Sequence, residues 1–193
     1  MTVQVGDIYK HNQIEYEIVK TSAPLVFNPQ NYGIRPESVV TCCWNGYWCE
    51  YTTVNGNLLL ETLYIHSKDN CYPQINGICA EPDNPKVFEH MGHHFYKHLN
   101  IPIPYTGKIL IVKGYVPGYS SPIGHRHILG YQAYLELIFE NGILNTVLDQ
   151  THIAQELRDQ VKKHLGEFES TFFHNMRTLH NMQLKTPPSV WWL

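Results

Sequence analysis

The sequence contains little charge and no long apolar run. Charged residues make up 16% of the 193 residues, below the roughly 25% of typical soluble domains. No apolar stretch reaches the ~20 residues of a membrane-spanning helix, and the first residues lack the charged start and apolar stretch of a secretion signal. The net charge is −3 and no basic block appears, so we expect neither nucleic acid nor a membrane as partner. A cytoplasmic protein is the expectation.

Sequence motifs of catalysis are also missing. The chain has no phosphate-binding glycine loop, no G-x-S-x-G motif and no C-x-x-C pair. The five cysteines are an odd number, which favours free thiols, and nothing in the sequence pairs one with a histidine, as cysteine catalysis requires. Cys42, Cys43 and Cys49 lie in a strand-like segment and are interpreted as small buried hydrophobic residues. The sequence therefore favours a protein that is not an enzyme.

Two Asn-Gly pairs give the clearest structural signal. Both residues of such a pair tolerate the positive φ of a type I′ turn, so Asn55-Gly56 and Asn141-Gly142 each predict a tight β-hairpin. The strand-like runs that they join are 47–54 with 58–65 and 132–140 with 143–148.

Alignment of the two turns places Glu50 on Glu136. The match indicates either a duplicated β-unit or the chance agreement of two hairpins. Period-2 alternation puts both glutamates on the outward face of their strands. There they are either solvated strand positions or paired carboxylates that face a common cleft.

Further strand-like runs complete a β-rich chain. Runs 6–10 and 14–19 predict an N-terminal hairpin, and 39–44 predicts another strand. Run 108–116 is almost entirely apolar, which indicates burial on both faces. We predict a single domain over 1–193 of mainly β (α+β) class. Its body, 1–150, is expected to be a two-sheet sandwich or a distorted barrel.

Two helices are predicted, one short and one long. Asn84 and Pro85 suit the start of a helix, and apolar residues at helical spacing predict an inserted helix over 85–99. A regular apolar stripe predicts a long helix over 152–180, within a C-terminal part 151–193 that ends in Trp191 and Trp192. The stripe either packs on the sheet or forms a dimer contact.

Histidines suggest a metal site. His90, His94 and His98 are four residues apart and would share one face of the predicted helix, and His125 and His127 form an H-x-H pair. Neutral imidazoles bind divalent metals such as zinc, so His90, His94, His125 and His127 are the candidate ligands. The H-E-x-x-H arrangement that supplies a general base is missing. The alternative is a set of surface or hydrogen-bonded histidines.

The segment 114–130 is the candidate binding loop. It is long and rich in glycine and proline, and such loops often carry function. Tyrosine and arginine are also residue types that dominate recognition hot spots. The candidate ligand-binding residues are Tyr115, Tyr119, His125, Arg126 and His127. The alternative is a plain surface crossover.

Three segments resemble a group of uncharacterised bacterial proteins. They are CCWNGYWCEYTTVNGNLLLETL over 42–63, YTGKILI over 105–111 and LELIFENGIL over 135–144. The matching motifs are aromatic strand positions and turn glycines. The resemblance implies a β architecture and a bacterial, cytoplasmic setting, and it implies no activity, cofactor or catalytic residue.

Two functions remain open from the sequence. The first is a non-catalytic binding or protein-interaction domain with a protein partner or a second copy in a homodimer, which predicts an exposed apolar or aromatic patch. The second is a His-rich metal-binding protein or metal-dependent hydrolase, which predicts that the candidate histidines converge on one point.

Overall fold

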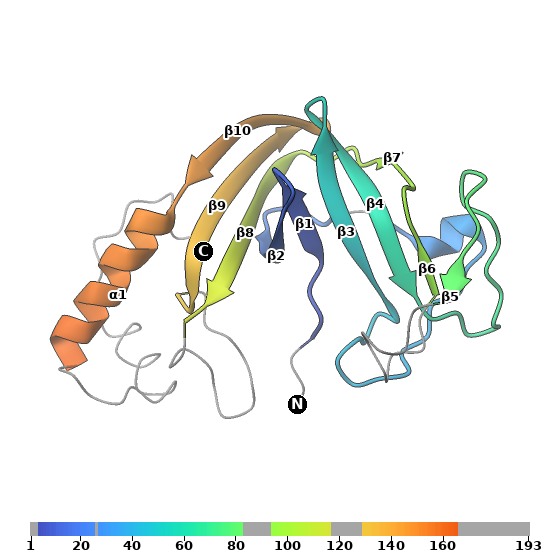
Figure 1. Cartoon of the computed structure of the whole chain (residues 1–193), viewed down its shortest axis with the longest axis horizontal. Helices are drawn as coiled ribbons and strands as arrows, with labels where there is room; N and C mark the ends of the chain where they lie inside the picture. The colour runs from blue at the N-terminus through green and yellow to red at the C-terminus, as the bar shows by residue number, and fades with distance from the viewer. Residues whose placement is uncertain (1–3, 26, 83–93, 117–128, 166–193) are drawn as a thin grey trace.

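The computed structural model describes residues 4–25, 27–82, 94–116 and 129–165, which form a mainly β protein (Figure 1). A short 3-10 helix covers Pro29–Tyr32, and one α-helix, α1, covers Thr151–Leu165. The strands are β1 (Ile8–His11), β2 (Ile14–Thr21), β3 (Tyr47–Val54), β4 (Asn57–Ile65), β5 (Glu81–Pro82), β6 (His94–Tyr96), β7 (Ile101–Pro102), β8 (Gly107–Tyr115), β9 (Tyr131–Glu140) and β10 (Ile143–Asp149).

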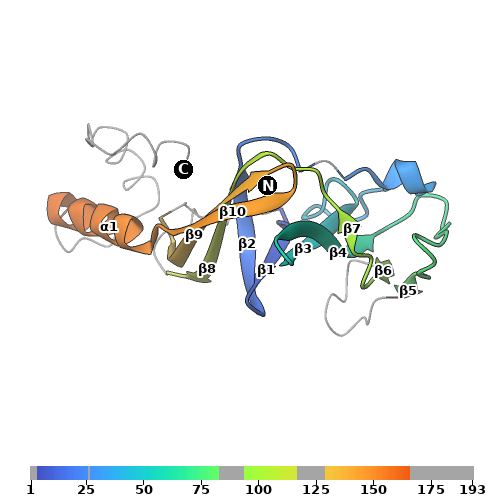
Figure 2. The ribbon, with the colours of Figure 1, turned by 90° about the horizontal axis from the view of Figure 1, so that it is seen from above.

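The described strands form one sheet, rather than the two of the predicted sandwich or a closed form of the predicted distorted barrel. Its order is β10-β9-β8-β2-β1-β3-β4-β6-β5, with β7 also paired to β4. Strands β1 and β3 run parallel, whereas the other pairs are antiparallel. Register shifts between β2 and β8, β3 and β4, and β9 and β10 mark irregularities, which increase local twist and bend a sheet. The sheet is therefore an arch, with α1 at one end and β5 at the other (Figures 1 and 2).

Both Asn-Gly hairpins are confirmed, and their tips meet at the top of the arch (Figure 1). The backbone N–H of Leu58 donates to the Gly142 carbonyl at 2.7 Å, and that of Leu144 donates to the Gly56 carbonyl at 2.8 Å. Ile143 and Asn57 are the single register pair between β10 and β4 among the described residues. Below this point β4 pairs with β7 and β6 instead, so β10 and β4 meet directly only at the hairpin tips, while β8, β2, β1 and β3 connect the two hairpins through the sheet.

The core lies mainly inside the arch. It is built from alternate residues of the strands, such as Cys49, Tyr51, Leu137 and Phe139, which are inward positions that alternation in the two hairpins predicts. Strand β8 contributes to both faces, as its apolar run predicts: Ile109 and Ile111 face the inner core, and Leu110 and Val112 pack on the outer face with residues of α1.

Helix α1 confirms only part of the predicted helix 152–180. It is anchored by Arg158, which is buried and donates to the carbonyls of Leu129 and Tyr131 at 3.0 and 2.6 Å. The rest of the predicted range, with Trp191 and Trp192, lies outside the described residues. Among the described residues, no helical segment has the length and hydropathy of a membrane span.

Two predicted elements are wrong. The described end of the predicted helix 85–99 is strand β6, because His94, Phe95 and Tyr96 pair with the last residues of β4, and His98 has a positive φ of 59°. The predicted strand 39–44 is a succession of turns, with hydrogen bonds from Cys43 N to Val40 O and from Gly46 N to Cys43 O. Val40, Cys42 and Cys43 of this segment pack in a small cluster on the outer face around Trp48, whereas Val39 and Trp44 are exposed.

Candidate functional site

The structure describes two of the residues predicted for binding or for metal. Tyr115 ends β8, and its ring meets Tyr131 edge to face at 6.3 Å. His94 lies in β6. The remaining candidates lie outside the described residues: His90, Tyr119, His125, Arg126 and His127. The predicted binding loop and the predicted convergence of histidines therefore stay predictions.

His94 is held in a way that suits an uncharged imidazole. Its ring stacks on Tyr72 at 3.7 Å between centroids, and its Nδ1 is buried without a hydrogen-bond partner. Burial, with a contribution from His66, lowers its pKa below the usual 6.5. Within the residues that the structure describes, no group of three or more His, Cys, Asp or Glu side chains could hold a metal ion. His94 is thus a neutral ring with one free nitrogen and no metal site among its described neighbours.

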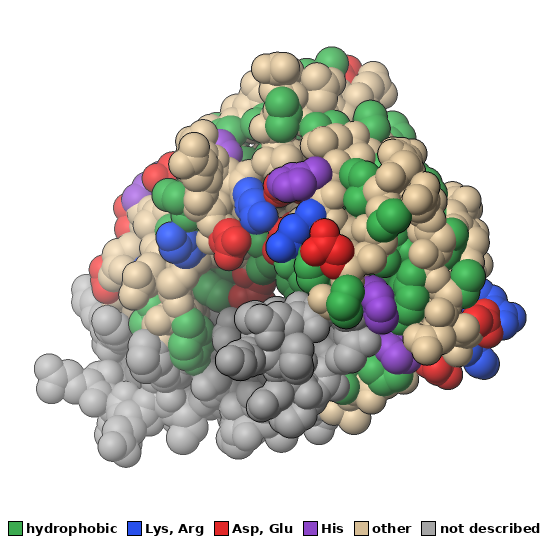
Figure 3. All heavy atoms as spheres, turned by 45° about the vertical axis from the view of Figure 1, so that its right-hand side comes forward, with side chains coloured by type: hydrophobic (Ala, Val, Ile, Leu, Met, Phe, Trp, Pro, Cys, Tyr) green, Lys and Arg blue, Asp and Glu red, His purple; other side chains and the backbone are tan. Residues whose placement is uncertain are grey.

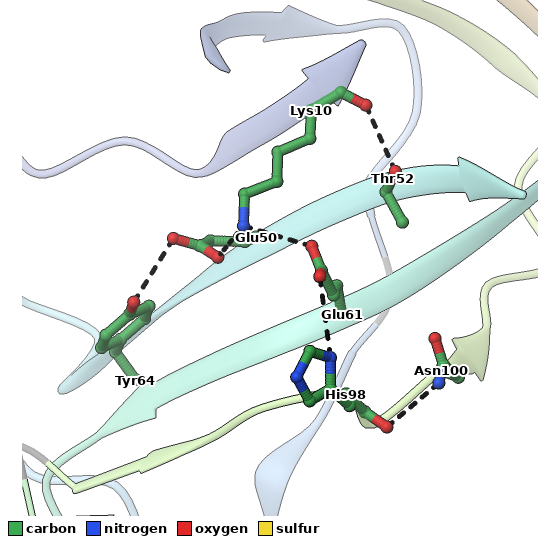
Figure 4. Close-up of polar contacts among 7 residues, drawn as sticks. All are labelled: Lys10, Glu50, Thr52, Glu61, Tyr64, His98 and Asn100. Carbon is green, nitrogen blue, oxygen red and sulfur yellow. Dashed lines mark hydrogen bonds and ion pairs between the residues drawn. The ribbon is translucent and has the colours of Figure 1, made fainter. Parts of the chain in front are cut away.

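A charged network lies on the outer face of β1, β3 and β4 (Figure 4). Lys10 Nζ lies 2.8 Å from Glu50 and 3.2 Å from Glu61, and the Tyr64 hydroxyl donates to Glu50 at 3.4 Å. Burial lowers the pKa of Lys10, but Glu50 and then Glu61 outweigh it, so the pKa is raised. Lys10 is therefore a fixed ammonium rather than a base or nucleophile. Figure 3 shows acidic and basic side chains side by side on this part of the surface.

The two aligned glutamates share this arrangement. Glu136 lies under Lys108 at 2.9 Å, as Glu50 lies under Lys10. Both carboxylates face outward, as alternation predicts, but the interpretation as solvated positions is wrong because both are buried. The lysine of a neighbouring strand covers each one. A buried carboxylate with such a partner is a structural ion pair rather than half of a catalytic pair.

Replacing Lys108 with methionine tests the cost of this arrangement. Glu136 is 1% exposed, so loss of the ammonium removes the ion-pair contact with Lys108 from a buried charge. We expect the free energy of unfolding at neutral pH to fall by about 2 kcal/mol, below the usual range for buried pairs because Lys108 is itself partly exposed.

Urea unfolding at neutral pH measures the effect of Lys108→Met. Adding Glu136→Gln should recover much of the loss, since a neutral amide no longer needs the ammonium. A double variant that recovers nothing would show that packing, not charge, is responsible.

The buried thiols of Cys43, in the cluster around Trp48, and of Cys49, in the inner core, do not suit catalysis. Burial raises the pKa of the Cys43 thiol and raises that of Cys49 well above 9.0, whereas a cysteine nucleophile needs a lowered pKa. The interpretation as buried hydrophobic residues is confirmed for these two, while Cys42 is half-buried. Asp7 lies beside them, accepts a hydrogen bond from Cys49 N at 2.8 Å, and has its pKa raised by burial to about 6.

The open feature of the fold is the edge strand β10. Beyond Leu144 it pairs with β9 alone among the described residues, and six of its seven residues are exposed. Val147 lies opposite the fully buried Leu137, so the inner core extends to this edge, where Val147 and Leu148 are each 39% exposed. Such an edge presents backbone groups and apolar side chains that can accept a further strand.

The opposite edge of the sheet differs. Strand β5 has two residues, one of them Pro82, and short, proline-bearing edges resist strand addition. Strand β10 has seven residues, no lysine and no proline. The sequence predicts a strand at 143–148 but not its position in the sheet. The exposed edge formed by β10 therefore could not be predicted from the sequence.

No protein-family model, curated protein or solved structure matches this chain. The likeness of its three segments to bacterial proteins therefore stays a prediction. Function has to be inferred from the residues and geometry of the chain itself.

Proposed function

We propose that this chain is a non-catalytic protein-interaction domain that binds an extended polypeptide segment as an additional strand along β10. One observation carries the proposal: a seven-residue strand, exposed at six positions, lies at the sheet edge and continues the inner core to the solvent. Main-chain hydrogen bonds would supply affinity, and alternate side chains of the partner would contact Val147 on the inner face.

The polar groups described elsewhere support binding over catalysis. The ammonium of Lys10 is held by two carboxylates, Glu136 is covered by Lys108, and Cys49 is a buried protonated thiol. None of these is a nucleophile paired with a base, which covalent catalysis requires. The exposed apolar residues of β10 are instead of the kind that the binding hypothesis predicts.

Selection of peptides displayed on phage tests the proposal. The chain is immobilised sparsely, so that copies cannot meet, and is offered random peptides of about twelve residues. We expect enrichment of sequences that alternate apolar and polar residues, and at least a tenfold loss of their binding to Val147→Lys, because an inward-facing charge on an edge strand blocks strand addition.

Ile14→Lys is the matched control for this experiment. Ile14 opens β2 and is 40% exposed, against 39% for Val147, but it lies away from the β10 edge. This variant should bind the selected peptides as tightly as the unchanged chain does. Peptides that bind Val147→Lys as well as the unchanged chain, or a selection without alternating sequences, would overturn the proposed function.

A further inference from the structure

We infer that the strand added along β10 is β10 of a second copy of this chain, placed antiparallel about a two-fold axis that passes beside Val147. The inference rests on the proposed function, since it names the partner of the same edge. It assigns a symmetric homodimer in which the sheets of the two copies form one continuous intermolecular sheet.

The symmetry follows from the two faces of the sheet. A two-fold axis perpendicular to the sheet keeps the inner face of one copy beside the inner face of the other, and such an axis makes the paired strands antiparallel. Parallel pairing of two copies would turn one sheet over and place its core face beside the charged outer face of the other. The antiparallel arrangement therefore keeps the apolar inner side of both edges together.

The register follows from the exposed side chains. Thr146 pairs with Ile138, Val147 with Leu137 and Leu148 with Glu136, so Val147 is the inward residue of this stretch, beyond the irregularity between Leu144 and Thr146. An axis beside Val147 places the two copies of this valine opposite one another, so that each covers the exposed apolar surface of the other. Leu148 then lies opposite Thr146 of the second copy on the outer side.

Charge also favours this register. Asp149 is the one charged residue in the sequence of β10, ILNTVLD. In the antiparallel register it lies opposite Asn145 of the second copy, whereas in parallel register two aspartates would be neighbours. Like charges directly opposite one another destabilise a strand pair, so the strand is compatible with an antiparallel copy of itself.

Formation of a disulfide between copies tests the register. Opposite Cα atoms in an antiparallel pair lie ~4.5–5.5 Å apart, within the range of a disulfide. Val147→Cys should therefore give a covalent dimer under mild oxidation, in a background in which the exposed Cys71 and Cys79 are changed to serine. Non-reducing electrophoresis and sedimentation of the product measure the yield.

Leu148→Cys in the same background is the matched control. Leu148 is as exposed as Val147, but its two copies would be offset by two residues, ~7 Å along the strand in addition to the strand spacing, beyond the reach of a disulfide. We expect at least a tenfold lower yield from this variant. Equal yields would indicate random collision and overturn the inference, and so would a higher yield from Leu148→Cys.

Two further measurements separate this inference from the proposed function. In sedimentation experiments the mean mass of the unchanged chain should rise with concentration, and Val147→Lys should stay at 22.4 kDa. A chain that binds displayed peptides through β10 but neither dimerises nor forms the Val147→Cys disulfide would overturn the inference and leave the proposed function standing. A chain that binds no peptide and does not dimerise would overturn both.

Discussion

Replacing Gly142 with alanine is expected to lower the free energy of unfolding by about 3–4 kcal/mol, whereas the same change at Gly56 should cost about 1 kcal/mol. The two glycines hold the same position in the two Asn-Gly turns, with φ of 81° and 82°. An alanine at either position pays the backbone cost of a positive φ. The additional loss at Gly142 comes from its surroundings.

Gly142 lies at the junction of the two hairpins. A Cβ atom there would lie 2.7 Å from the Ile103 carbonyl oxygen, while at Gly56 nothing lies within 4 Å. Gly142 also donates its N–H to Tyr105 O, and its carbonyl accepts from Leu58 N of β4, so moving the turn away from Ile103 breaks the backbone bonds that hold it to Tyr105 and to β4. The clash therefore cannot be relieved locally.

Urea unfolding of the two variants at one pH measures the difference. Gly56→Ala is the control, because it introduces the same methyl group at the same φ without the contact. Similar losses for the two variants would mean that the hairpin tips do not meet as described. In that case the arch would not be joined at its top.

Local patterns account for most of the strands. The Asn-Gly pairs and the alternating residues around them predict β3, β4, β9 and β10 to within a residue or two, because a type I′ turn fixes the register of the strands that flank it. The apolar run 108–116 likewise predicts the burial of β8 on both faces. These features depend on neighbours in the sequence and can be predicted from it.

Long-range pairing accounts for the errors. Phe95 and Leu99 have helical spacing, but residues 94–96 instead pair with β4, whose residues lie far away in the sequence. The burial of Glu50 and Glu136 depends on Lys10 and Lys108, which reach them from neighbouring strands. The open edge depends on the order of all the strands. None of these relations has a local signature in the sequence.

Asp7 is expected to make the free energy of unfolding fall as the pH rises. An ordinary ion-paired carboxylate has the opposite effect on the pH dependence of stability. Burial raises its pKa from 3.8 to about 6, although the hydrogen bond from Cys49 N acts to lower it. The folded state therefore holds this proton more tightly than the unfolded state. The contribution of Asp7 to the free energy of unfolding is greatest below about pH 4 and is lost as the pH rises toward 6. Since each pKa unit corresponds to about 1.4 kcal/mol, the ionised form costs about 2–3 kcal/mol.

Asp7→Asn should remove this cost. The amide has the shape of the carboxyl and its oxygen can still accept from Cys49 N. It carries no charge beside Tyr47, Cys49 and Tyr51, whose pKa values are raised by burial and in smaller part by the charge of Asp7. We expect a gain of about 2–3 kcal/mol near pH 8 and little change near pH 4. Urea unfolding at both pH values measures the difference.

Asp149→Asn is the control of opposite sign. Hydrogen bonds from the hydroxyl and the backbone N–H of Thr151 hold the pKa of Asp149 below its usual value, so its contribution is present above about pH 4 and is lost as the pH falls through the lowered pKa. This variant should lose stability at neutral pH and approach the unchanged chain in acid. A gain from Asp7→Asn that is equal at both pH values would show that burial of the ionised carboxylate is not its cause.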